Sequence, residues 1–92
     1  MIRLNGDALH IEGPVTLQTV PELLAGAAPH LAAGVRRIDF SAATEVDSAA
    51  VALALEWQRQ ARGGVALENL PAAMQNLARL YGVSDLLQAP AR

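Results

Sequence analysis

The stretch from Ile38 to Trp57 reads IDFSAATEVDSAAVALALEW, and it decides the fold of this chain. At its start, apolar Ile38 and Phe40 flank an acidic residue, which is the period-two pattern of a strand with one buried face. From Ser48 onward the stretch is rich in alanine and leucine at helical spacing. Asp47 stands one residue before that helix, where its carboxylate can accept hydrogen bonds from free backbone N–H groups. The stretch therefore predicts a strand, a loop and a capped helix.

The flanking segments extend this unit into one α/β domain over residues 1–92. The order β-β-α-β-α-β-α predicts a mixed, mostly parallel sheet of about four strands, joined by right-handed crossovers and covered by helices. Asn5-Gly6-Asp7 predicts the turn of a hairpin, Gly13-Pro14 ends that hairpin, and 41–46 is expected to be a loop. The expected strands are 2–4, 8–12, 35–40 and 65–68, and the expected helices run from 20 to Gly34, from 48 to about Arg62 and from Pro71 to Gly82.

Local patterns add detail at the helix ends. Thr19 followed by Glu22 has the form of a capping box. Pro29 should kink the first helix or end it one turn early, because proline lacks a backbone donor. The segment 83–87 is expected to pack back on the domain and 88–92 to fray. The last long helix is expected to bury an apolar stripe made of Met74, Leu77, Leu80 and Tyr81.

Composition excludes several classes of function. The chain has a net charge of −2 and seven basic residues, all arginines scattered along it, so no basic stripe is available for nucleic acid or anionic lipid. No apolar run approaches the roughly 20 residues needed to cross a bilayer, and the start MIRLNGD lacks the apolar core of a signal peptide. Without cysteine there is no disulfide or thiolate chemistry. We expect a cytoplasmic protein that reaches a membrane only through a partner.

The helix after Asp47 has one apolar and one smooth face. At about 100° per residue, the face expected to cover the sheet comprises Ala50, Val51, Ala54, Leu55, Trp57 and Ala61. The opposite face comprises Ser48, Ala49, Ala52, Glu56, Arg59 and Gln60. Its first half carries only methyl groups and one hydroxyl, so another backbone could approach closely. The alternative is simple helix capping and alanine's helix propensity, without a docking role.

No catalytic, cofactor or metal site is expected. His10 and His30 lie on separate elements, and a metal site normally needs three or four ligands. A hydrolase based on Ser48 lacks the Gly-x-Ser-x-Gly turn. Three acidic residues, Asp39, Glu45 and Asp47, cluster around one loop and could pair as general acid and base. Asp39 is instead expected to face solvent or to pair with Arg37. Trp57 is expected in the core or at its boundary, with an interface hot spot as the alternative.

The segment Val46-Asp47-Ser48-Ala49-Ala50, with its strand before and aliphatic helix after, resembles the STAS domain family. The resemblance extends to the closing Asn76–Val83 and covers nearly the whole chain. Anti-sigma-factor antagonists of that family carry Asp-Ser-Ser-Gly, and their first serine is phosphorylated. The resemblance implies that Ser48 is the equivalent acceptor, at a helix end that favours added negative charge. This chain departs from the motif at Ala49 and Ala50.

Within the family, the chain most resembles the small, MlaB-like STAS subunit of the Mla phospholipid-transport ABC complex. That resemblance implies a cytoplasmic, non-catalytic subunit that binds the transporter's ATPase, and through it a permease at the inner membrane. It would stabilise or activate the ATPase and so support outer-membrane lipid asymmetry. A phosphorylation switch with a serine kinase and an anti-sigma factor is the alternative. The expected partner-binding residues are Glu45, Asp47, Ser48, Ala49, Ala52 and Glu56.

Overall fold

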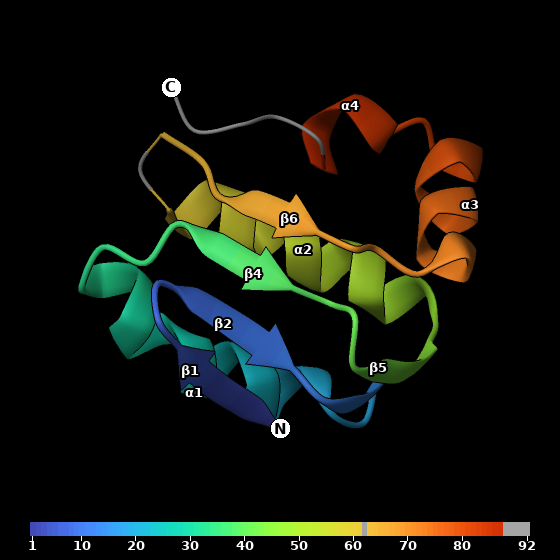
Figure 1. The fold of residues 1–92 in the computed structure, drawn as a ribbon. Helices are drawn as coiled ribbons and strands as arrows, with labels where there is room; N and C mark the ends of the chain where they lie inside the picture. The colour runs from blue at the N-terminus through green and yellow to red at the C-terminus, as the bar shows by residue number, and fades with distance from the viewer. Residues whose placement is uncertain (62, 88–92) are drawn as a thin grey trace.

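The computed structural model describes residues 1–61 and 63–87, and its centre is a four-stranded sheet (Figure 1). The strand order is β1-β2-β4-β6. β1 pairs with β2 in antiparallel fashion, whereas the pairs β2–β4 and β4–β6 are parallel. The mixed, mostly parallel sheet expected from the sequence is confirmed. The strands are β1 (Ile2–Asn5), β2 (Ala8–Ile11), β4 (Arg37–Asp39) and β6 (Ala66–Glu68).

Helices cover one face of this sheet. α1 (Val20–Ala32) and α2 (Ser48–Gln60) lie behind the strands in Figure 1, while α3 (Ala72–Leu80) and the short α4 (Ser84–Leu87) pack on α2 beyond β6. The second helix was expected to reach about Arg62 but ends at Gln60, because Ala61 is an extended C-cap. Arg62 itself and the segment 88–92 that was expected to fray lie outside the described residues. The expected return of 83–87 is confirmed, because Leu87 is buried in the core.

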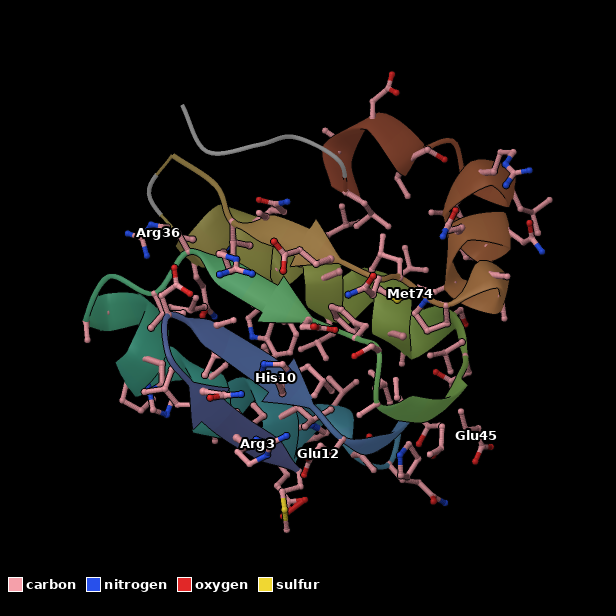
Figure 2. All side chains as sticks on the ribbon, viewed as in Figure 1. Arg3, His10, Glu12, Arg36, Glu45 and Met74 are labelled. Atoms are coloured by element: carbon pink, nitrogen blue, oxygen red, sulfur yellow. The ribbon has the colours of Figure 1, made fainter. Side chains whose placement is uncertain are left out.

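The two faces of the sheet differ as the period-two pattern predicts. Leu9 and Ile38, which are neighbours in the β2–β4 register, are fully buried toward the helices. The next row, which runs from β1 to β6, faces the side that none of the described helices covers, and Figure 2 shows Arg3 and His10 on that side. The uncovered face is therefore a polar surface. Its central row is Arg3, His10, Asp39 and Glu68.

The ion pairs on this face correct one expectation. Arg37 does not pair with Asp39; its guanidinium donates to Glu68 at 3.0 and 3.1 Å and to Asp7 at 2.6 Å. Asp39 accepts instead from the backbone N–H of Ser41 at 2.7 Å. Side chains two apart on one strand stand in parallel, whereas Glu68 on the neighbouring β6 and Asp7 in the β1–β2 turn offer opposite charges within reach of a long arginine side chain.

The surroundings of Asp39 lower the pKa of its carboxyl. The backbone N–H of Ser41 is the main cause, partial burial opposes it, and the Asn69 amide at 3.3 Å and the nearby His10 ring lower the pKa further. Because the folded-state pKa lies below the unfolded one, ionised Asp39 stabilises the fold above the unfolded pKa. That stabilisation is lost as the pH falls through the folded pKa.

We therefore expect Asp39→Asn to reduce the difference in unfolding free energy between about pH 7 and about pH 3, because one titrating group is removed. Urea unfolding at the two pH values measures this difference. Asn69→Gly is the matched control: it removes only a weaker donor and glycine tolerates the φ of 56° at that position, so most of the pH dependence should remain. Equal pH dependence in the wild type and Asp39→Asn would contradict the role assigned to Asp39.

A second, two-stranded sheet was not predicted. β3 (Gly13–Val15) pairs in parallel with β5 (Ala43–Val46), in segments that the sequence presented as a turn and a loop. Each strand is only three or four residues long, which is too short to show a repeating pattern in the sequence. Each is stabilised by its pairing with the other. The full order is therefore β-β-β-α-β-β-α-β-α-α. The pairing brings the segment before α1 next to the start of α2.

Two details of α1 also differ from the sequence prediction. The predicted capping box is wrong, because the Thr19 hydroxyl makes no cap hydrogen bond. That hydroxyl instead accepts from the Thr16 N–H at 3.0 Å and donates to the Pro14 carbonyl at 3.0 Å. Its side chain turns back to its own loop, so Glu22 has no reciprocal partner there. Pro29 does not end the helix one turn early, because α1 continues to Ala32.

The apolar stripe expected in α3 is only half buried. Met74 is fully buried and Leu77 is partly buried, but Leu80 is 76% exposed and Tyr81 is 53% exposed. On a helix, Leu80 lies about 120° from Met74, so both cannot face α2. Ala78 takes the buried position instead. Tyr81 follows the last helical residue, just before the chain turns away toward α4.

Candidate functional site

The start of α2 has the geometry that its sequence predicts. Asp47 is the N-cap in an extended conformation (φ −133°, ψ −170°), and its Oδ1 accepts from the Ala49 N–H at 2.9 Å. Ser48 is the first helical residue and is exposed. A cap of this kind satisfies one of the free donors at the helix end and defines where the helix begins.

The second oxygen of Asp47 has a role that the sequence did not reveal. Oδ2 accepts from the backbone N–H of Leu17 at 3.1 Å, across 30 residues of sequence. One carboxylate thus joins the start of α2 to the loop between β3 and α1. Both oxygens are engaged, so Asp47 is placed for holding two segments together rather than for proton transfer.

The six residues predicted to bind a partner lie along β5 and one side of α2. Glu45, Ser48 and Ala52 are exposed, while the other three are partly buried. The opposite side of the helix is in the core as expected, with two differences: Leu55 is only partly buried, and Leu53, which was on neither predicted face, is fully buried. The structure therefore brings the predicted residues onto one continuous strand–helix segment. The partly buried ones are Asp47, Ala49 and Glu56.

Glu56 is tied to its own helix. Arg59 forms an ion pair with it three residues on, and the Gln60 amide donates to it at 3.0 Å. These hydrogen bonds, chiefly that from Arg59, lower the pKa of Glu56 to about 2. The carboxylate stays ionised at neutral pH, and a partner that approaches Glu56 must compete with Arg59 for it.

Two shallow hollows flank Glu45, which projects outward from β5 (Figure 2). The larger, of about 400 Å³, lies between the β3–α1 loop and the cap of α2. The smaller, of about 180 Å³, lies between β5 and the start of α3. The larger hollow contains two carboxylates and no basic side chain. Its lining residues are Pro14, Thr16, Leu17, Gln18, Thr19, Glu45 and Asp47.

Sequence reasoning missed Leu17 as a candidate surface residue. Its side chain is 75% exposed, although its backbone is bound to Asp47. The available signal was a leucine between threonine and glutamine in a segment with no helical or strand period. Nothing in the sequence places that segment beside Ser48, because the β3–β5 pairing brings them together.

The remaining candidates for chemistry lie apart from this surface or are already engaged. His10 is on β2 and His30 is on α1. No group of three or more metal-ligating side chains occurs within residues 1–61 and 63–87. Asp39 and Asp47, two of the three clustered acidic residues that could have paired as general acid and base, bind different backbone donors. Trp57 is fully buried, so the interpretation as a core residue is confirmed.

No described helix is long and apolar enough to cross a membrane.

Comparison with known proteins places this geometry in a family. No curated protein matches the chain. The solved structure of the anti-sigma factor antagonist SpoIIAA in its unphosphorylated form is similar in fold, with a TM-score of 0.69 and 17% sequence identity over 94% of this chain and 83% of that one. The family described as "Mlab, STAS domain" matches residues 2–88, which is nearly the whole sequence. The chain therefore belongs to the Mlab-type STAS domain family.

Proposed function

We propose that this chain is a non-catalytic, cytoplasmic STAS subunit that binds the ATPase of a phospholipid-transport ABC complex. Membership of the Mlab-type family supports the partner class. The observation that carries the proposal is the bare surface at the start of α2, where Ser48 and Ala52 are exposed beside partly buried Ala49. Small side chains at that place allow the backbone of a partner to approach closely.

In this proposal the domain acts as a rigid adaptor. The cap of α2 presents the Ser48–Ala49–Ala52 surface, and Glu45 and Glu56 lie beside it as acidic neighbours. Binding stabilises or activates the ATPase and, through it, the permease at the inner membrane. The subunit is thus peripheral to that membrane, and its work supports the lipid asymmetry of the outer membrane.

Ala52→Arg tests this surface directly. A long charged side chain at the centre of a close contact should weaken binding of the ATPase by about tenfold or more. Because Ala52 is exposed, the unfolding free energy should change by less than about 0.5 kcal/mol. Calorimetric titration with the purified ATPase subunit measures the affinity. Ala25→Arg, the same change at an exposed position of α1, should bind as the wild type does. Wild-type affinity in a folded Ala52→Arg variant would contradict the proposal.

A second candidate is a partner switch of the anti-sigma-factor-antagonist type, controlled at Ser48. Its support is that Ser48 is exposed at the N-terminal end of α2 and that SpoIIAA shares the fold. A phosphate there adds about −1.5 to −2 charges next to Asp47 and Glu45, and so repels an acidic partner. Intact-mass measurement of the protein from cells in several growth states tests this. Only unmodified protein in every state would count strongly against the switch.

Purification of the tagged chain from native membranes separates the two candidates. Recovery of an ABC ATPase together with its permease supports the transport role. Recovery of a serine kinase or an anti-sigma factor from the soluble fraction, with no transporter, supports the switch.

A further inference from the structure

Leu17 is an exposed apolar side chain on an ordered turn. Three interactions fix the turn: the Leu17 N–H donates to Asp47, the Thr16 N–H donates to the Thr19 hydroxyl at 3.0 Å, and that hydroxyl lies 3.0 Å from the Pro14 carbonyl. The leucine is nevertheless 75% exposed. Because the backbone that presents this side chain is already fixed, its burial by a partner costs only the rotamer freedom of the leucine itself.

The charge around Leu17 indicates what kind of surface would cover it. The hollow beside it contains the carboxylates of Glu45 and Asp47 and no basic group. Asp47 is occupied by two backbone donors, whereas Glu45 is exposed. A complementary partner therefore offers an apolar pocket for the leucine and a basic side chain for Glu45.

We propose that Leu17 is the apolar anchor of the ATPase-binding surface, that Glu45 pairs with a basic residue of the ATPase, and that Asp47 positions Leu17. This inference rests on the proposed function and extends its surface from α2 across the hollow to the β3–α1 loop. The Asp47 carboxylate makes the two parts one unit, because it binds Leu17 with one oxygen and the start of α2 with the other.

The test compares leucines of equal exposure. Leu17→Ala should weaken binding of the purified ATPase subunit by about tenfold or more, while Leu80→Ala should leave it unchanged, since Leu80 is 76% exposed at the far end of α3. Leu17→Met should retain most of the affinity, because methionine fills a similar volume. Glu45→Arg should weaken binding and reverse the sign of its salt dependence, because salt then screens a repulsion between like charges.

The possible results separate this inference from the proposed function. If Leu17→Ala binds normally while Ala52→Arg does not, the anchor is wrong and the transport role stands. If both bind normally, the transport role fails as well. A photo-crosslinker at position 17 should capture the ATPase in cells; capture of a second copy of this chain or of a kinase instead would overturn the assignment.

Asp47→Asn tests the positioning role. One oxygen remains to cap α2 through the Ala49 N–H, but the new NH₂ group faces the Leu17 N–H, and two donors cannot bond. We expect faster hydrogen exchange at the Leu17 amide and an affinity loss close to that of Leu17→Ala, with protection of the α2 amides retained. Unchanged exchange together with wild-type affinity would exclude a positioning role for Asp47.

Discussion

Replacing Trp57 by alanine is expected to lower the free energy of unfolding by about 3–5 kcal/mol, the usual cost of removing a large buried aromatic side chain. The indole is fully buried, and its ring lies 6.1 Å from that of Phe40 on the covered side of the sheet. A domain of this size has a total stability of about 5–15 kcal/mol. The variant should therefore unfold at far lower urea concentration than the wild type, as followed by far-UV circular dichroism.

Trp57→Phe is the matched control. The indole Nε1–H is buried and has no hydrogen-bond acceptor within the described part of the chain. An unpaired buried donor costs about 1–3 kcal/mol, so phenylalanine loses some packing but also removes that cost. We expect Trp57→Phe to be destabilised by less than half as much as Trp57→Ala. Equal losses of unfolding free energy in the two variants would show that an aromatic ring at position 57 contributes little packing energy. Both variants lack the chain's single tryptophan, so fluorescence cannot serve as the probe.

Replacing Gln58 by alanine is expected to cost about 2–3 kcal/mol, although Gln58 is only partly buried. Its Nε2 donates to the Val65 carbonyl at 2.8 Å and to the Leu87 carbonyl at 3.2 Å, and its Oε1 accepts from the Val65 N–H at 2.7 Å. The side chain thus joins α2 to the start of β6 and to α4. Without it, three backbone groups lose a partner in a region where water has little access.

Hydrogen exchange localises this effect. In Gln58→Ala the Val65 amide should lose protection more than the amides of β2 do, because only the edge near β6 is released. Gln60→Ala serves as the control. Gln60 is exposed, and among the described residues its side chain bonds only to Glu56 of its own helix, so its loss should stay within about 0.5 kcal/mol. A Gln58→Ala variant as stable as Gln60→Ala would show that water replaces the amide.

The structure places the two departures from the antagonist motif in different surroundings. Ala50 is fully buried against the core, so packing restricts that position to a small residue, which glycine and alanine both are. Ala49 is partly exposed at the surface, and its N–H is bound by the Asp47 cap. Position 50 therefore belongs to the core, whereas Ala49 belongs to the surface that we assign to the partner.

The sequence by itself determined the elements with a strong local period and a local end signal. Ile38 and Phe40 predicted the strand β4, which ends one residue before Phe40, and Asp47 predicted the start of α2. Alternation, helical spacing and caps depend only on neighbours in the chain. The same patterns predicted the parallel sheet, since β-α-β units connect in one hand. They also separated the buried and bare sides of α2, on which the candidate surface depends.

Only the tertiary structure decided what depends on contacts between distant segments. The β3–β5 pairing, the partners of Arg37 and the bond from Leu17 to Asp47 each join residues about 30 positions apart, and no local pattern encodes the choice among possible partners. The exposure of Leu80 likewise follows from the direction in which α3 meets α2. The sequence therefore located half of the candidate surface, on α2, whereas the other half, at Leu17, exists only because two short strands with no period of their own stabilise each other in the folded chain.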